Sequence, residues 1–293
     1  MEVAMSQPFL LYRILGNDLP PRHADTQTAD NLAFMLTNEP VLRDCDKWFC
    51  LNRIYDPKKR AALVEILGKA GAKWFEIPFD ADEYNVIDSK PGRLHYLTNV
   101  NAARNACLDH GFDQDAEMVI PMDGGCAMRN DGWENLLTNF WMHDSDGYFL
   151  LPTWRCDTYE EYLDEMHPPQ IREAYQFPGG REVVGVREPM IAFTTNHDAR
   201  FDPELVYGKC DKCELLFRLG VPGIWDRWEP QIKKRALTEK PISKHYTHSK
   251  MVAYNVRLPS GKGKLDHHNL KRGQARKEGM MKAVDLADKI HRS

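Results

Sequence analysis

The first 155 residues of this 293-residue chain alternate between short apolar segments typical of strands and longer segments with helical spacing. The predicted strands are 8–15, 46–54, 72–79, 117–122 and 147–154. The predicted helices are 28–39, 56–71, 97–111 and 130–144. Strands that alternate with helices form a mostly parallel sheet, because each crossover lays its helix against a face of the sheet. We therefore expect an α/β fold with helices on both faces.

Residues with known end preferences mark the two helices that flank the second strand. Thr28 is the expected N-cap of the first helix. In the second helix, Asp56 is the expected cap, Pro57 suits the first turn and Gly71 ends the helix.

The second half of the chain is less regular. Residues 157–182 are rich in carboxylates and aromatic rings and are expected to form an irregular insertion. Residues 183–195 are typical of a hairpin-like β segment, and residues 210–220 predict a helix that ends at a glycine.

Composition indicates a globular protein, with 42% hydrophobic and 28% charged residues. No apolar stretch approaches the roughly 20 residues of a membrane helix, and the N-terminus lacks the pattern of a signal peptide. Seven scattered cysteines indicate reduced thiols. We therefore expect a cytoplasmic location, with the Cys210 and Cys213 pair packing on a helix rather than binding zinc.

Net charge is −4, which excludes a basic nucleic-acid-binding surface over the whole protein. Basic residues nevertheless cluster late in the chain: Lys262, Lys264, Lys271, Arg272, Arg276 and Lys277. A solvated tail or terminal helix is the favoured interpretation of this basic C-terminal segment. A patch that binds phosphates is the alternative.

Polar and glycine residues fall at the ends of three of the predicted strands, at 16–18, 52–53 and 123–125. Ligands of open α/β sheets bind at the carboxyl ends of the strands, so these residues are expected to line one crevice. Asp123 ends an apolar run and precedes two glycines, which let a ligand approach the backbone. A carboxylate there suits a hard divalent cation, although Asp-Gly is also a common turn pair.

The segments RILGNDLPPRH, WFCLNRI, NAARN and VIPMDGG, taken in order, resemble nucleotide-sugar-dependent glycosyltransferases of the GT-A fold. The resemblance covers residues 8 to about 225. The N-terminal motif is also similar to a subgroup related to the glucosyltransferases that modify hydroxymethylpyrimidines in DNA, the base J type. The resemblance implies one GT-A-like domain over residues 1–293. Its segments would be a nucleotide-sugar-binding half (7–155), an acceptor-side half (156–232) and the basic C-terminal segment (233–293).

The resemblance assigns donor-binding roles to six residues: Arg13, Asn17, Asp18, Arg104, Asn105 and Asp123. Arg104 would reach the diphosphate or the sugar, because a guanidinium makes bidentate contacts to phosphate. An ion pair is the competing role for Arg13, and a turn cap is the competing role for Asp18.

Asp123 stands where the family's metal-binding DxD motif begins, but the second carboxylate is missing here. The resemblance implies a divalent cation, Mn²⁺ or Mg²⁺, held by Asp123 and by a late histidine, His248 in preference to His245. For each histidine taken alone, a surface position is favoured over metal ligation.

The resemblance also implies a catalytic base in the acceptor-side half. The family's second acid of a pair corresponds to Lys212, so Asp211 is the first substitute and Glu214 the second. Glu188 is a third candidate. Acids at a helix N-terminus are also favoured by the helix dipole alone.

The reaction implied is transfer of a hexose, glucose first, from a UDP-sugar to an acceptor hydroxyl. The subgroup resemblance and the basic segment favour 5-hydroxymethylpyrimidine in DNA, such as 5-hydroxymethylcytosine, in a bacterial or phage-infected cell. A polysaccharide or a small molecule is the alternative acceptor. A nucleotidyltransferase and a non-catalytic nucleotide-sugar-binding protein are the alternative classes, and the stiff, lysine-free RILGNDLPP loop counts against the former.

Overall fold

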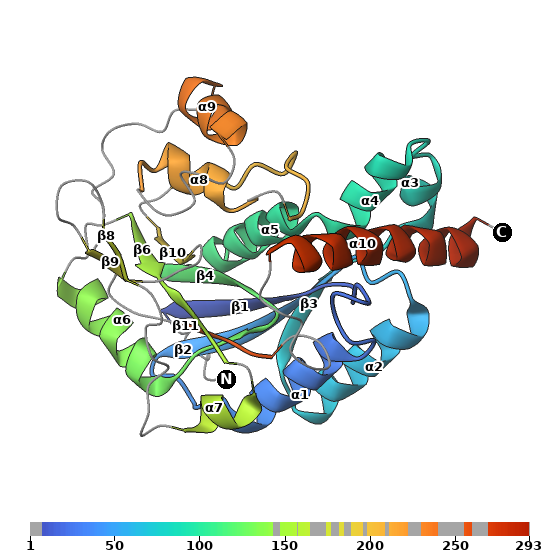
Figure 1. Ribbon diagram of the computed structural model, residues 1–293. Helices are drawn as coiled ribbons and strands as arrows, with labels where there is room; N and C mark the ends of the chain where they lie inside the picture. The colour runs from blue at the N-terminus through green and yellow to red at the C-terminus, as the bar shows by residue number, and fades with distance from the viewer. Residues whose placement is uncertain are drawn as a thin grey trace.

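The computed structural model describes residues 8–142, 147–156, 158–164, 174–176, 182–184, 189–195, 198–208, 211–221, 230–239, 255–259 and 269–292. At its centre is a six-stranded sheet in the order β3-β2-β1-β4-β10-β6 (Figure 1). These strands are β1 (Phe9–Leu15), β2 (Cys45–Asn52), β3 (Lys73–Ile77), β4 (Met118–Asp123), β6 (Tyr148–Leu151) and β10 (Met190–Thr194). The first four are parallel to one another, and β10 is antiparallel to both β4 and β6. The predicted mostly parallel α/β sheet is confirmed.

Helices cover both faces of this sheet, with α5 and α8 on one face and α1 and α2 on the other (Figure 1). The helices before the acceptor-side half are α1 (Gln27–Asn38), α2 (Pro57–Lys69), α3 (Ala81–Asn85), α4 (Lys90–Thr98), α5 (Val100–Phe112) and α6 (Asn130–Met142). The later ones are α7 (Tyr159–Leu163), α8 (Cys213–Arg218), α9 (Pro230–Glu239) and α10 (Asn269–His291).

Strand β1 shows how the sheet divides the core. Successive side chains of a strand point to opposite faces. Leu10, Tyr12 and Ile14 pack with α5 and α8 in one apolar cluster, whereas Phe9 and Leu11 pack with α6 in another. All seven residues of β1 are buried, which requires helices on both sides of the strand.

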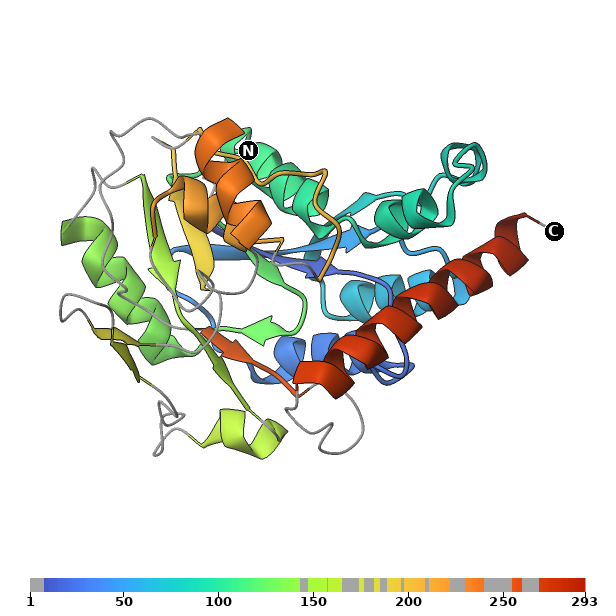
Figure 2. The same cartoon turned by 45° about the horizontal axis from the view of Figure 1, so that its top comes forward.

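Two smaller sheets flank the main one. The first has the order β5-β11-β7 and the second pairs β8 with β9. Their strands are β5 (Cys126–Ala127), β7 (Thr153–Arg155), β8 (Ala174–Gln176), β9 (Glu182–Val184) and β11 (Asn255–Arg257). Because β5 begins three residues after Asp123, its pairing with β11 brings a strand from late in the sequence beside the end of β4 (Figure 2). Arg257 of β11 pairs with Cys126 of β5.

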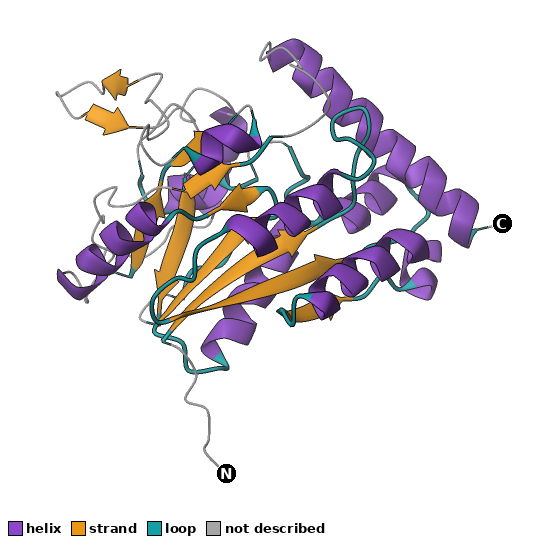
Figure 3. Cartoon of the chain, turned by 90° about the horizontal axis from the view of Figure 1, so that it is seen from below, coloured by secondary structure: helices purple, strands orange, loops and turns teal. Residues whose placement is uncertain are grey.

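The C-terminal helix α10 packs along α4 at one side of the molecule (Figure 3). The hydroxyl of Tyr84 donates to Asp288 at 2.8 Å, and Arg93 pairs with the same carboxylate at 3.1 Å. Gly279 lets α10 approach the loop after β1, since a Cβ there would lie 2.3 Å from the carbonyl oxygen of Leu19. The described part of the basic C-terminal segment thus contains a packed helix. None of the described helices is long and apolar enough to span a membrane.

The structure corrects two local predictions. Thr28 is not the N-cap of α1. The cap position is Thr26, which makes no side-chain cap hydrogen bond, and the carboxylate of Asp18 instead accepts from the backbone N–H of Thr28 at 3.0 Å. A cap supplied from another loop leaves no signal at the helix start. Helices α3 and α4, which the sequence analysis did not predict, fill the connection between β3 and α5.

Other local predictions are confirmed. Asp56 caps α2 by accepting from the N–H groups of Lys58 and Lys59. Cys213 is fully buried in the cluster beneath α8, as expected for a packing cysteine, while Cys210 lies outside the described residues. The division of the chain into three segments stays a prediction, although β10 and α8, from the acceptor-side half, complete the sheet and core of the first half.

Substitution of Gly124 tests why a glycine must follow Asp123 at the end of β4. A Cβ at Gly124 would lie 2.4 Å from the carbonyl oxygen of Ile14, whereas at Gly125 the nearest atom is 3.4 Å away. Gly124→Ala should lower the free energy of unfolding by about 1–3 kcal/mol, because backbone must move. Gly125→Ala is the matched control and should change it far less. Urea denaturation measures both, and equal effects would contradict this explanation.

Candidate active site

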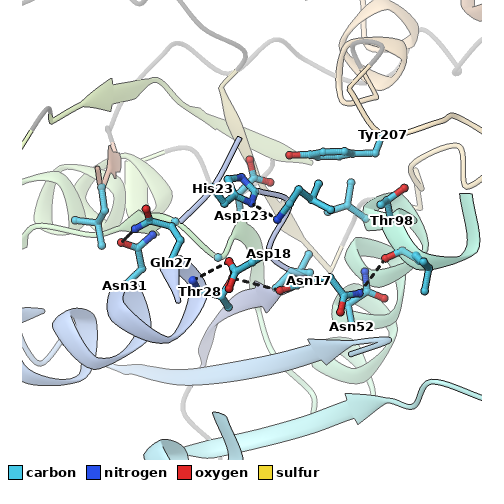
Figure 4. Close-up of a pocket in the computed structure, with 18 of the residues that line it drawn as sticks. Asn17, Asp18, His23, Gln27, Thr28, Asn31, Asn52, Thr98, Asp123 and Tyr207 are labelled. Carbon is cyan, nitrogen blue, oxygen red and sulfur yellow. Dashed lines mark hydrogen bonds between the residues drawn. The ribbon is translucent and has the colours of Figure 1, made fainter. Parts of the chain in front are cut away.

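A pocket opens at the carboxyl ends of β1, β2 and β4. Its lining includes residues of all three predicted strand-end groups, every one except Arg53, so their convergence is confirmed, although their binding role stays a prediction. The lining residues are Ile14, Gly16, Asn17, Asp18, Leu19, His23, Gln27, Thr28, Asn31, Asn52, Leu97, Thr98, Val100, Asp123, Gly124, Gly125, Tyr207, Arg257 and Leu258. Figure 4 shows Asn17 and Asp18 on one side of this pocket and the ring of Tyr207 on the other.

The loop after β1 is held in place by its own polar side chains. Asn17 donates to the carbonyl groups of Arg53 at 2.8 Å and Leu97 at 3.3 Å. Asp18 accepts from the hydroxyl of Thr28 at 2.7 Å. Burial raises the pKa of Asp18 to about 6, against the opposing effect of these hydrogen bonds. The two residues therefore shape the pocket wall, and Asp18 changes its charge near neutral pH.

Arg104 joins two of the predicted site residues. Its side chain is buried, and it donates to Asp123 at 2.8 Å and to Asp211 at 2.9 Å. A third bond goes to Asn101, whose own amide donates to the backbone of the acceptor-side half at Asp202 and Asp211. Burial lowers the pKa of Arg104, but the two carboxylates outweigh it and raise that pKa above its usual range. Arg104 therefore positions Asp123 rather than lining the pocket itself.

Two more cations surround Asp123. The ammonium group of Lys212 lies 3.5 Å from Oδ2 of Asp123, and Arg257 lines the pocket from β11. Burial raises the pKa of the Asp123 carboxyl, but Lys212, Arg104 and Arg257 outweigh it and hold that pKa well below its usual range. These three cations therefore favour the ionised form of Asp123.

The other predicted donor residues are engaged elsewhere. Arg13 lies within β1 and forms a buried ion pair with Glu39, on the face that also carries Phe9 and Leu11. Period-two alternation thus directs Arg13 away from the pocket. Asn105 makes two hydrogen bonds of 2.9 Å to the backbone of Phe201, which tie the loop 198–208 to α5.

Of the predicted bases, Asp211 is brought next to the Asp123 cluster by Arg104. Its other oxygen accepts from the N–H of Gly208 at 3.3 Å. Glu214 is instead buried beside Arg218, with contacts of 2.6 and 3.0 Å. Neither of these two carboxylates is among the lining residues of the pocket. Glu188, His245 and His248 lie outside the described residues.

Sequence reasoning missed the positions of Arg257 and Tyr207 in the pocket. Arg257 is in a short strand within the late basic part of the chain, where many cations make one hard to single out. Tyr207 carries Arg276 of α10 over its ring at 5.6 Å, and Arg276 also donates to the carbonyl of Gly208. Helix α10 therefore supports one wall of the pocket.

The described residues do not fit a divalent cation at Asp123. Such ions prefer several oxygen ligands, yet within the described ranges no group of three or more His, Cys, Asp or Glu side chains converges. Both oxygens of Asp123 already face cations, Arg104 and Lys212. A metal site at Asp123 and His248 therefore stays a prediction that the described side chains do not support.

Comparisons with known proteins give weak structural similarity. No family model and no curated protein sequence matches the chain. The chain is similar to S. aureus TarS 1-349 in complex with UDP, with TM-score 0.41 and 13% identity over 72% of this chain and 54% of that one. It is also similar to the mannosyltransferase PcManGT from Pyrobaculum calidifontis in complex with GDP-Man and Mn²⁺, with TM-score 0.38 and 11% identity over 95% and 64%. The chain spans about half the length of the TarS structure, and similarity this low assigns neither family nor activity.

Removing Arg104 tests the bridge between Asp123 and Asp211. Arg104→Met keeps an apolar stem but leaves two largely buried carboxylates without their shared cation. It should lower the free energy of unfolding by about 3 kcal/mol in urea denaturation. Arg43→Met, which removes an exposed pair with Glu134, should cost less than about 1 kcal/mol. An equal loss of unfolding free energy in the two variants would show that the Arg104 bridge stabilises the fold no more than an exposed ion pair does.

The raised pKa of Asp18 predicts a pH dependence of stability. Between about pH 4 and 6 the folded state binds more protons at this carboxyl than the unfolded state, so stability falls as pH rises through that window. The amide oxygen of Asp18→Asn can still accept from Thr28, but the side chain no longer titrates. Between about pH 4 and 6, the free energy of unfolding of this variant should therefore decrease by about 2 kcal/mol less than that of the wild type. Urea denaturation at several pH values measures the difference between the wild type and the variant.

The matched control for that experiment is Thr37→Ala, which changes an exposed residue of α1 that has no titratable side chain. Its difference from the wild type should stay constant across the same pH range. Parallel curves for the wild type and Asp18→Asn would contradict the assignment of this titration to Asp18.

Proposed function

We propose that the protein is an enzyme, a glycosyltransferase that moves a hexose from a nucleotide sugar, UDP-glucose first, to an acceptor hydroxyl. The observation that supports this most is the position of Asp123. Its carboxylate reaches a pocket at the carboxyl edge of a parallel sheet, beside two glycines and the cation Arg257. Ligands with phosphate groups bind at this edge of such sheets.

The pocket offers the kinds of group that a nucleotide sugar needs. The ring of Tyr207 is available to stack on a base or a sugar. Arg257 is placed to contact the diphosphate, because a guanidinium binds two phosphate oxygens at once. Backbone at Gly16 and Gly125 is open to close approach. Asn17 and Asp18 hold the loop after β1, which carries Gly16.

The chemical step would be displacement at the anomeric carbon. The acceptor oxygen forms a bond to that carbon while the bond to the phosphate oxygen breaks, and the electron pair leaves with the diphosphate. Positive charge fixed beside the pocket by Arg257 and Lys212 stabilises the leaving group. Asp211 is the proposed base that takes the acceptor proton, since Arg104 brings it to the same cluster as Asp123.

For the acceptor, we propose 5-hydroxymethylpyrimidine in DNA, on the resemblance of the N-terminal motif and on the basic C-terminal segment. In that segment Arg276 is used inside the protein, on Gly208 and Tyr207, so it contributes little to a surface that binds DNA. The side chains of Lys262, Lys264, Lys271 and Arg272 are outside the described residues. A polysaccharide or small-molecule hydroxyl is the alternative acceptor that the same site accommodates.

The rival classes differ in what they do with the donor. A nucleotidyltransferase would transfer the nucleotide itself, and the loop after β1 lacks the lysine that such enzymes place on phosphates. A non-catalytic binding protein would hold the nucleotide sugar without releasing UDP.

The test is incubation of the protein with UDP- and GDP-hexoses, with and without DNA that contains 5-hydroxymethylcytosine. Mass spectrometry of the nucleosides measures transfer, and release of the nucleotide measures turnover. We expect UDP release from UDP-glucose, accelerated by the true acceptor. Asp123→Asn should slow it at least about 100-fold, because the charge that organises the cations is lost.

The matched control is Asp46→Asn, which alters a surface pair with Lys73 at the opposite edge of the sheet. It should leave the rate within about twofold of the wild type. Full activity of a folded Asp123→Asn protein would contradict the proposal. Tight binding of UDP-glucose without any release of UDP would favour the non-catalytic alternative. Acceleration by an oligosaccharide but not by DNA would replace the proposed acceptor.

A further inference from the structure

Each oxygen of the Asp123 carboxylate faces a different cation of the protein. Oδ1 accepts from Nη2 of Arg104 at 2.8 Å, and Oδ2 lies 3.5 Å from Nζ of Lys212. A divalent cation at Asp123 needs at least one of these oxygens as a ligand. To bind there, it would have to displace the ammonium group and enter the field of the neighbouring cations.

Lys212 is fixed in the wall of the site rather than loose on the surface. The residue is 8% exposed, and its ammonium group also contacts Sδ of Met190 at 3.6 Å. A buried ammonium group is costly unless an anion lies beside it, and Asp123 supplies that anion. Lys212 directly precedes α8, which is packed into the main core cluster, so its backbone is anchored as well.

The charges of this cluster do not balance. Arg104, Lys212 and Arg257 are positive, while Asp123 and Asp211 are negative. Among these five described side chains, the cations outnumber the carboxylates by one beside the pocket. That excess attracts a diphosphate and opposes a further cation.

We propose that the ammonium group of Lys212 takes the place on Asp123 that a divalent cation would occupy, so that the site binds a nucleoside diphosphate through protein cations and without a metal ion. The binding of the diphosphate rests on the proposed function, but the exclusion of the metal from Asp123 does not. In this arrangement Arg257 contacts the diphosphate from the pocket wall. Lys212 is a positioning residue that neutralises Asp123 and adds positive charge from beside it.

Two departures of this sequence from the family's pattern support this inference. The sequence has Gly124 and Gly125 where the DxD pattern would have its second acid, and position 212 carries a lysine where the resemblance expects an acid. The structure brings these two departures to one place, because Lys212 contacts the carboxylate that the pattern retains. The missing acid and the added lysine both shift the charge of this cluster in the positive direction, which is the direction in which a bound divalent cation would shift it.

The first experiment measures Mn²⁺ binding directly, by electron paramagnetic resonance of the free ion, in the full-length protein without nucleotide. The wild type should bind no more Mn²⁺ than Asp123→Asn does. Lys212→Asp replaces the cation beside Asp123 with a second carboxylate and should bind Mn²⁺ at least about tenfold more tightly than the wild type. Lys212→Arg should behave like the wild type, and so should Lys69→Met, which removes an exposed lysine of α2.

Circular dichroism and thermal melting show which variants are folded. A wild-type Mn²⁺ site that Asp123→Asn removes would overturn the proposal. A folded Lys212→Asp protein that binds Mn²⁺ no better than the wild type would also overturn it. Both readouts are independent of any nucleotide, so they decide the inference even if the proposed function fails.

The second experiment needs only the wild type, which covers the case in which Lys212→Asp does not fold. Calorimetry measures UDP binding in EDTA and in MnCl₂. We expect the two dissociation constants to agree within about threefold. Binding at least about tenfold tighter in Mn²⁺ would overturn the proposal. Absence of UDP binding in both buffers would instead count against the proposed UDP-sugar donor, while the Mn²⁺ titration still decides the role of Lys212.

Discussion

The buried guanidinium of Arg104 is the interaction on which the site depends. It holds Asp123, at the end of β4, and Asp211, just before α8, through two bonds of 2.8 and 2.9 Å. These residues are far apart in sequence, so this one side chain sets how the acceptor-side half meets the sheet. A buried cation needs both carboxylates, and each carboxylate needs the cation. Structure and charge at the pocket are therefore coupled, and neither half of the chain can shift without breaking a buried ion pair.

Around this bridge, the pocket is built from parts that stabilise the fold as well. Asp18 caps α1 from the loop after β1, and Gly279 lets α10 pack against the same loop. On the other wall, Arg276 of α10 supports Tyr207. Helix α10 thus packs against residues on both sides of the pocket. A basic helix that seemed available for an external partner has at least one of its cations committed to this internal task.

Much of the fold could be predicted because its signals are local. The apolar run of β1, the Asp56 cap of α2 and the strand-end residues Asn17 and Asp123 all follow from short-range pattern. The site could be predicted only in part. Arg13 was expected at the pocket, but strand alternation turns it to the opposite face, where Glu39 pairs with it. Asn105 was expected near the donor, but it clamps the backbone of Phe201.

The sequence by itself determined the α/β class, the order of the parallel strands along the chain and the delivery of Asp123 to the edge of the sheet, because periodicity and turn residues act over a few neighbours. Only the tertiary structure decided what surrounds that carboxylate. Lys212 and Arg257 reach it from segments 89 and more than a hundred residues away, through the docking of α8 and the pairing of β11 with β5. Electrostatic interactions depend on distance in space and not on separation along the chain. The partners of a charged group therefore become visible only once the chain has folded.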